Sequence, residues 1–221
     1  MESKFLIPSA AMMLMLLSCS HADVYVPRDG DLAFQAVFAE VPASGSGFSR
    51  AIADATAQGD SVKFVHVGIV ASAPGGRPCV IEASPQRGVV CTDWDVFIED
   101  SRLPDGRTGV VIMRVADRGF PVEDAVARAM EHIGEEYDWS YLPDNGKTYC
   151  SELVYESYVG EDGEPLFEAV PMNFRDAGGN LPEFWVDLFE KLGEPVPEGV
   201  PGTNPANLAA SAHLVEVFRY F

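Results

Sequence analysis

Short apolar runs separated by turn-forming residues recur along the chain and predict β-strands. The turn signals include Pro74-Gly75-Gly76 after one run and Asp105-Gly106 before another. We therefore expect strands at residues 31–38, 63–71, 78–84, 88–92 and 109–115, and a closing strand at residues 214–221.

Segments with a helical pattern lie between and after these runs. The helix expected at residues 121–133 begins at Pro121, carries Glu123 and Asp124 in its first turn and is followed by Gly134. Other helices are expected at residues 48–58, 93–99, 149–158 and 181–192, and loops in the Pro/Gly-rich stretches 160–180 and 193–204. This order predicts an α+β fold with helices packed against an antiparallel sheet.

Composition limits the domain count and the partners. The chain has 221 residues with 47% hydrophobic content, which suits a single domain with a substantial core. Its formal net charge is −19, whereas binding to nucleic acid needs clustered Lys and Arg. We therefore exclude nucleic acid as a partner, and the charge also disfavours a strongly anionic substrate.

The N-terminal residues 1–22 have the pattern of a signal peptide. Lys4 precedes an apolar run at residues 5–17 that is too short to remain as a membrane span. The sequence Leu16-Leu17-Ser18-Cys19 resembles a lipoprotein signal, so lipidation of Cys19 is one expectation and simple cleavage after Ala22 is the other. Either way residues 23–221 form the mature domain in the cell envelope, secreted or attached only through a lipid anchor.

His66 and Glu82 interrupt two of the apolar strands. Alternation along residues 63–71 places His66 and Gly68 on one face of a strand that is apolar on both faces. If the next strand forms a hairpin with this one, Glu82 lies opposite His66 or very close to it, within reach of a hydrogen bond. That bond would fix the histidine tautomer and leave its other nitrogen free to act as a base. A histidine bonded to a carbonyl in the core, or a structural ion pair, would give the same pattern.

Cys150 lies in the first turn of the helix expected at residues 149–158, with Thr148 as the expected N-cap. The free amides and the dipole at this end of a helix stabilise a thiolate and can also bind an oxyanion. Ser151 is a weaker nucleophile because its hydroxyl would have to be fully deprotonated. The alternative for Cys150 is a small buried hydrophobic residue.

Two other cysteines flank the turn at residues 85–88. The expected hairpin register places Cys79 and Cys91 opposite one another, on the sheet face away from Glu82. In an oxidising compartment they would form a disulfide and leave Cys150 free, and the alternative is a pair of buried thiols.

Several motifs together resemble the YiiX-like permuted papain-like amidases of the NlpC superfamily. The matching stretches, in the family's order, lie at residues 30–35, 48–52, 64–70, 80–83, 133–138 and 149–154. The resemblance implies a circularly permuted papain-like fold with Cys150 as nucleophile, His66 as base and Glu82 as orienting acid. It also implies that Asp31 ends or ties down the first strand near the site and that Tyr149 shapes the pocket beside the thiolate, and we expect both, with Ser151, to contact substrate.

The expected activity is hydrolysis of an amide bond through an acyl-enzyme, with a peptide or an N-acyl small molecule as substrate. No metal or organic cofactor is expected, because the metal-binding residue types show no zinc-like spacing. Three forms of the function stay open: a cell-wall peptidase or amidase, a lipid-directed amidase or acyltransferase, and a catalytically silent lipid- or peptide-binding module. An apolar pocket formed by residues such as Phe174, Phe184 and Trp185 would favour acyl chains, and a wide polar cleft would favour cell-wall peptides.

Overall fold

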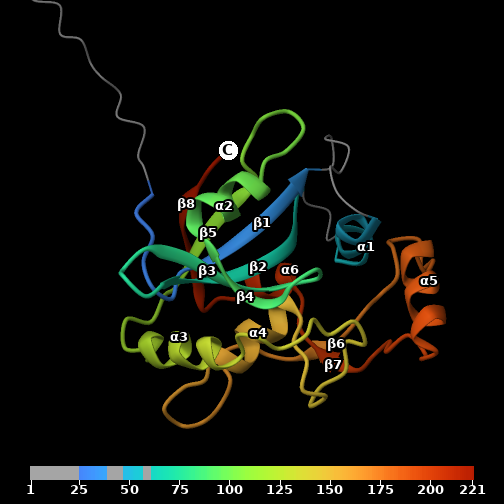
Figure 1. The fold of residues 1–221 in the computed structure, drawn as a ribbon. Helices are drawn as coiled ribbons and strands as arrows, with labels where there is room; N and C mark the ends of the chain where they lie inside the picture. The colour runs from blue at the N-terminus through green and yellow to red at the C-terminus, as the bar shows by residue number, and fades with distance from the viewer. Residues whose placement is uncertain (1–24, 39–46, 57–60) are drawn as a thin grey trace, which may run out of the picture.

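A six-stranded antiparallel sheet forms the centre of the protein in the computed structural model, which describes residues 25–38, 47–56 and 61–221 (Figure 1). The strand order is β4-β3-β2-β1-β5-β8, and every neighbouring pair is antiparallel. The strands are β1 (Leu32–Phe38), β2 (Val62–Ser72), β3 (Pro78–Ser84), β4 (Gly88–Asp93), β5 (Val110–Val115) and β8 (Leu214–Arg219). The predicted signal peptide at residues 1–22, with Cys19, lies outside the described residues.

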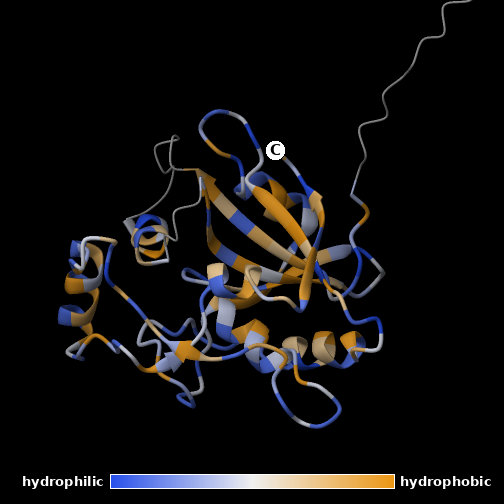
Figure 2. Cartoon of the chain, turned by 180° about the vertical axis from the view of Figure 1, so that it is seen from behind, coloured by the Kyte–Doolittle hydropathy of each residue, from blue (hydrophilic) through white to orange (hydrophobic). Residues whose placement is uncertain are grey.

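Helices cover both faces of the sheet. On one face, α3 (Val122–Glu131) and α4 (Cys150–Ser157) pack against the apolar residues of β2 and β3, with α6 (Pro205–Ala209) against β2. On the other face, α2 (Trp94–Asp100) closes a smaller apolar cluster. Figure 2 shows hydrophobic residues along the central strands and on the inner sides of α3 and α4. The sheet is buried on both faces, which explains the nearly continuous apolar runs of β2 and β3.

The remaining elements lie beside this core. Helix α1 (Gly47–Ala55) contacts β2, and α5 (Glu183–Leu192) contacts α1. A short antiparallel pair joins β6 (Val170–Pro171) to β7 (Pro201–Gly202). In the described part of the chain, no helix has the length and apolar character needed to span a bilayer.

The predicted fold class is confirmed, and the predicted strands and long helices agree with the structure to within a few residues at their ends. The main difference is α6, which lies between the loop expected at residues 193–204 and the strand expected at residues 214–221, where no helix is expected. Asn204 is the N-cap of α6 and accepts a hydrogen bond from the Asn207 amide at 2.9 Å, with Pro205 at the first helical position. This combination is a helix-start signal that the sequence does contain.

The two edge strands of the sheet, β4 and β8, differ in how their outer edges are covered. Residues 134–135 cover the β4 edge, because Val89 donates to the Glu135 carbonyl and accepts from the Gly134 amide, both at 2.9 Å. Gly88 permits this approach: a Cβ there would lie 2.1 Å from the Glu135 oxygen, and its φ is +69°. At the other edge, β8 leaves Val215 and Val217 exposed.

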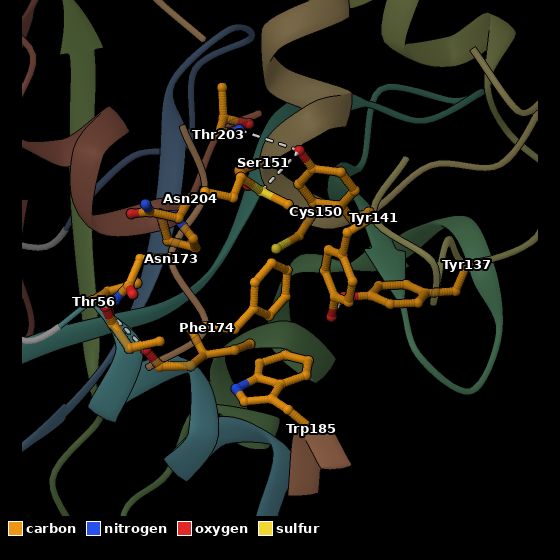
Figure 3. A pocket seen from close by; sticks show the side chains of 15 residues that line it. Thr56, Tyr137, Tyr141, Cys150, Ser151, Asn173, Phe174, Trp185, Thr203 and Asn204 are labelled. Carbon is orange, nitrogen blue, oxygen red and sulfur yellow. Dashed lines mark hydrogen bonds between the residues drawn. The ribbon is translucent and has the colours of Figure 1, made fainter. Parts of the chain in front are cut away.

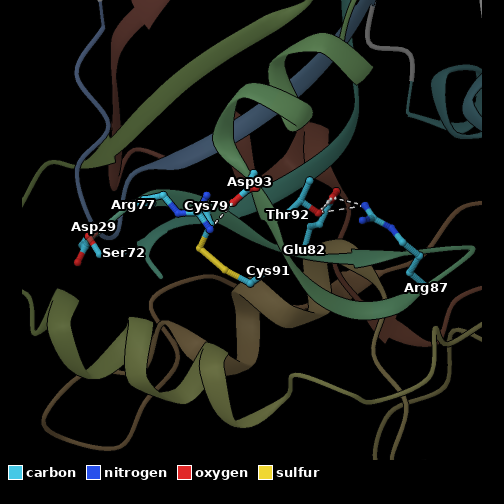
Figure 4. The surroundings of a disulfide bond; sticks show 9 residues. All are labelled: Asp29, Ser72, Arg77, Cys79, Glu82, Arg87, Cys91, Thr92 and Asp93. Carbon is cyan, nitrogen blue, oxygen red and sulfur yellow. Dashed lines mark hydrogen bonds and ion pairs between the residues drawn. A yellow bond between two sulfur atoms is a disulfide. The ribbon is translucent and has the colours of Figure 1, made fainter. Parts of the chain in front are cut away.

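A disulfide joins Cys79 of β3 to Cys91 of β4, on the face of the hairpin away from Glu82 (Figure 4). The register pairs Cys79 with Asp93 and Ile81 with Cys91. The two cysteines are therefore diagonal neighbours, and the expectation that they lie directly opposite is wrong by one pair. Cys150 carries a free thiol.

Removal of this disulfide should lower the stability of the protein. The bridge closes a loop with a sequence separation of 12, for which loop-closure entropy gives about 2–4 kcal/mol. We expect a double variant, Cys79→Ser with Cys91→Ser, to lose this amount in denaturant unfolding. Reductant should destabilise the wild type to the same level and leave the double variant unchanged. Equal stability of oxidised and reduced wild type would contradict the prediction.

Candidate active site

Cys150 is the first residue of α4, where the helix amides have no partner within the helix. The N-cap is Tyr149, whose amide donates to Glu152 Oε2 at 3.3 Å. Burial, followed by the charge of Glu156, raises the pKa of Glu152 to about 8. Glu152 is therefore protonated at neutral pH, and it adds no negative charge beside the cysteine that would oppose a thiolate.

The expected N-cap role of Thr148 is wrong. Its side chain is buried, and its hydroxyl donates to Glu135 Oε2 at 2.5 Å instead of capping α4. The Thr148 carbonyl accepts the Asp138 amide at 3.2 Å. Thr148 thus connects the segment before α4 to residues 135–138, and Tyr149 is the N-cap of α4 instead.

His66 and Glu82 form a short hydrogen bond on adjacent strands. His66 Nε2 lies 2.6 Å from Glu82 Oε2, and because an ionised carboxylate can only accept, the histidine nitrogen is the donor. The β2–β3 register pairs Ile69 with Ile81, so Gly68 faces Glu82 and His66 is its diagonal neighbour. A Cβ on Gly68 would lie 3.2 Å from the Glu82 Cβ and 2.4 Å from Val80 Cγ1. The glycine therefore leaves room for the neighbouring strand.

A bulge lies next to His66. Gln35 of β1 pairs with His66, and the following residue, Ala36, pairs with Phe64, which leaves Val65 as an extra residue in β2. A bulge of this kind bends its strand and changes the direction of nearby side chains. Phe64 therefore lies on the face of Val67, while His66 keeps the face of Gly68 and Val70, toward Glu82.

The second oxygen of Glu82 is held by two further side chains. Thr92 Oγ1 donates to Glu82 Oε1 at 2.6 Å, and Arg87 Nη2 donates to the same oxygen at 3.1 Å (Figure 4). Burial acts to raise the pKa of Glu82, but the hydrogen bonds from His66 and Thr92 outweigh it and lower the pKa. Glu82 is thus ionised and fixed in orientation. Thr92 and Arg87 were not predicted from the sequence, although hairpin register places Thr92 on the Glu82 face.

His66 carries a positive charge at neutral pH. Burial acts to lower the pKa of His66, but hydrogen bonds with Cys150 and Glu82 raise it to about 10. Since Nε2 is bonded to Glu82, Nδ1 is the nitrogen available to Cys150. The structure therefore brings the three predicted catalytic residues together in one line, with the half-buried imidazole of His66 between the buried Glu82 carboxylate and the buried Cys150 thiol.

This arrangement predicts a pH-dependent contribution to stability. The pKa of His66 rises from 6.5 to about 10 on folding, so its contribution is complete below pH 6.5 and is lost as the pH approaches 10. We expect the difference in unfolding free energy between wild type and His66→Ala to shrink steadily between pH 7 and pH 10. Urea unfolding of both proteins at several pH values measures it, with His213→Ala as an exposed control. A difference that stays constant over this range would contradict the raised pKa.

Two separate cavities of different character are lined by members of this line, one by Cys150 and the other by His66 and Glu82. Cys150 lines a narrow cavity of about 50 Å³ whose walls are mostly aromatic or apolar (Figure 3). The His66 side opens into a cavity of about 290 Å³ with many polar groups. The first is lined by side chains such as Ile52, Tyr137, Tyr141, Met172, Phe174 and Trp185, and the second by Gln35, Ser49, Glu82, Ser84, Gln86, Arg87 and Asp100.

The residues expected to contact substrate are only partly brought together. Tyr149 and Ser151 line the cavity beside Cys150, as do Phe174 and Trp185, whereas Phe184 packs on Phe48 outside the lining.

Asp31 ties down the first strand, as expected, but it does not lie in either cavity beside the catalytic line, so the expected contact with substrate is wrong. Its buried carboxylate accepts two hydrogen bonds from Arg114, at 2.5 and 2.7 Å, and one from Tyr25 at 2.5 Å. Asp31 lines a third cavity, which includes neither Cys150 nor His66. It anchors the start of β1 to β5, so its role there is structural.

The fold and this line of residues define the class of protein. The family model described as "permuted papain-like amidase enzyme, YaeF/YiiX, C92 family" matches residues 27–218, and the chain belongs to this family. Among curated proteins, it is similar to the uncharacterized protein YiiX of Escherichia coli K12, with 26% identity over 190 residues. That match covers 84% of this chain and 83% of YiiX.

A solved structure shows the same fold. The crystal structure of YiiX from Escherichia coli O157:H7 superposes with a TM-score of 0.65 at 24% identity, covering 88% of this chain and 98% of YiiX. Its title calls YiiX a metalloprotein. Among the residues described for our chain, no group of three or more His, Cys, Asp or Glu residues is placed to hold a metal ion.

Proposed function

We propose that the protein is a cysteine amidase in which Cys150 attacks, His66 transfers protons and Glu82 orients the histidine. The observation that carries this proposal is the short His66 to Glu82 hydrogen bond, with Cys150 near enough to the same imidazole to raise its pKa. An imidazolium beside a thiol favours the thiolate, and the free amides at the start of α4 favour it further. The membership of a family of papain-like amidases supports the same activity.

The reaction follows from these positions. The Cys150 thiolate forms a bond to the amide carbonyl carbon, and the developing oxyanion is stabilised by amides at the start of α4. His66 gives its proton to the leaving nitrogen as the C–N bond breaks, which leaves an acyl thioester on Cys150. The now neutral His66 takes a proton from water, and the hydroxide releases the acid and restores the thiolate.

The two cavities suit the two halves of the substrate. The amine that leaves takes its proton from His66, so it lies on the His66 side, in the larger polar cavity. The acyl group then occupies the narrow apolar cavity beside Cys150. This division favours the lipid-directed form of the activity, an amidase or acyltransferase, over hydrolysis of cell-wall peptides.

We further propose that the domain acts in the cell envelope after export. The signal-like residues 1–22 and the lipoprotein pattern ending at Cys19 support export. The Cys79 to Cys91 disulfide also supports it, because such bonds persist in oxidising compartments. Intact-mass measurement of the protein purified from its host envelope would show either a lipidated Cys19 or a soluble chain beginning near residue 23.

The test of the activity is labelling of the mature protein with limiting iodoacetamide across pH, together with hydrolysis of neutral acyl amides. We expect Cys150 to be labelled at pH 6.5 about tenfold to a hundredfold faster than an ordinary thiol, whose pKa is about 8.5. His66→Ala should return the pH profile to that of an ordinary thiol, and Cys150→Ala should abolish labelling. If wild-type Cys150 reacts no faster than an ordinary thiol, the amidase proposal fails and the binding-module alternative stands.

A further inference from the structure

The cavity beside Cys150 contains three buried polar atoms that have no hydrogen-bond partner among the described residues. They are Ser151 Oγ, Trp185 Nε1 and Thr203 Oγ1, from residues that are each at most 3% exposed and that line this cavity. Leaving such a group unpaired costs about 1–3 kcal/mol. Their positions in the lining of a mostly apolar cavity make them candidate partners for a molecule bound there.

These atoms come from three separate parts of the chain. Ser151 follows the nucleophile in α4, Trp185 lies in α5, and Thr203 follows β7. In Figure 3, Ser151 and Thr203 lie at one end of the cavity, Trp185 lies at the other, and the Cys150 sulfur is between them. A molecule attached to Cys150 that extends toward α5 would therefore reach the indole N–H.

The chemistry of the three atoms limits what they can pair with. An indole N–H only donates, so Trp185 requires an acceptor, whereas the hydroxyls of Ser151 and Thr203 can donate or accept. Among the described residues, the lining contains no lysine, arginine, histidine, aspartate or glutamate. Burying a charge there would be costly without a counter-charge, so the group that binds is neutral.

We propose that this cavity binds a neutral acyl chain that carries a hydroxyl or carbonyl oxygen, recognised by Trp185 and by Thr203 with Ser151. The inference rests on the proposed amidase function and names its substrate class. The aromatic walls hold the hydrocarbon part of the chain, and the polar atoms select for the oxygen. A plain hydrocarbon chain would leave these polar atoms unpaired, and a carboxylate-bearing chain would bury a charge.

The experiment measures acylation of Cys150 by p-nitrophenyl esters of hexanoate, 3-hydroxyhexanoate, 6-hydroxyhexanoate and hydrogen adipate. The thiolate bonds to the ester carbonyl carbon, the C–O bond breaks and p-nitrophenolate leaves, which gives a coloured burst and a defined mass increase. We expect at least one hydroxyhexanoate to acylate about tenfold to a hundredfold faster than hexanoate, and adipate to be slowest. Hexanoate reacting as fast as both hydroxy esters, or adipate reacting fastest, would overturn the proposal.

Variants identify the selecting atoms. Trp185→Phe and Thr203→Val remove the polar atom and keep most of the shape, and at least one should bring the hydroxyhexanoate-to-hexanoate ratio close to one. Trp94→Phe, on the opposite sheet face, is the matched control and should keep the ratio. A ratio that persists in Trp185→Phe, Thr203→Val and Ser151→Ala, each with a wild-type circular dichroism spectrum, would overturn the assignment.

Failure of this inference is distinguishable from failure of the amidase proposal. Iodoacetamide labelling reports on the thiolate without depending on pairing to Trp185, Thr203 or Ser151. If Cys150 is labelled rapidly and is acylated by every ester without preference, only the substrate class is wrong. If it is neither labelled rapidly nor acylated, the amidase proposal itself fails.

Discussion

Gly68→Ala is expected to lower acylation of Cys150 by at least about a hundredfold and to destabilise the protein by about 1–3 kcal/mol. The new Cβ would lie 2.4 Å from Val80 Cγ1, 3.1 Å from the Ile81 carbonyl oxygen and 3.2 Å from the Glu82 Cβ. Two of these three atoms belong to side chains and one to the backbone of β3, so β3 must move away. Glu82 would move with β3, and His66 would lose the carboxylate that orients it.

The acylation burst and iodoacetamide labelling, measured beside urea unfolding, separate the two effects. Gly47→Ala is the control, because a Cβ there would meet Phe184 at an ordinary distance of 3.6 Å. Adding Val80→Ala to Gly68→Ala removes the closest contact and should restore part of the activity. Full activity in the single variant would show that β3 can adjust without moving Glu82, and it would contradict the prediction.

Asp31→Asn is expected to lower the free energy of unfolding by about 2–4 kcal/mol and to leave labelling of Cys150 unchanged. Asp31 is 1% exposed and is held by two hydrogen bonds from Arg114. Asparagine keeps the shape of the side chain but has no charge. Its NH₂ group is a donor, so it cannot pair with the Arg114 guanidinium or the Tyr25 hydroxyl, which donate to Asp31 in the wild type.

Urea unfolding and iodoacetamide labelling of the same samples measure both parts of this prediction. Asp29→Asn is the matched control, since Asp29 is exposed and accepts one hydrogen bond from Ser72. We expect that variant to stay within about 0.5 kcal/mol of wild type. If Asp31→Asn instead slows labelling without loss of stability, the sequence-based role of Asp31 at the site would be right and its structural role wrong.

The strands and helices predicted best are those whose apolar and turn-forming residues follow one another directly in the sequence. Strand β3 was predicted at its observed bounds, because Pro78 and the turn after Ser84 delimit an apolar run. Neighbours within a hairpin follow from the same pattern, which is why Glu82 could be placed near His66. The diagonal register of the disulfide could not be predicted, since a hairpin register depends on the turn geometry.

The residues that line the cavity beside Cys150 are the part of the site that the sequence predicts least. Its walls come from α1, from the segment around Tyr137 and Tyr141, from α5 and from the turn after β7. No local periodicity marks residues that meet only through tertiary packing. Thr203 illustrates this: its buried hydroxyl becomes informative only when the chain around it is folded.

The position of β8 at the end of the sheet has a consequence for self-association. Residues 134–135 occupy the outer edge of β4, whereas in the described part of the chain no strand pairs with the outer edge of β8. A free strand edge with exposed valines, here Val215 and Val217, is a template for pairing with another chain. Another strand could therefore extend the sheet, in an ordered dimer or during aggregation, along β8, whereas on β4 the segment at residues 134–135 blocks the edge at Val89.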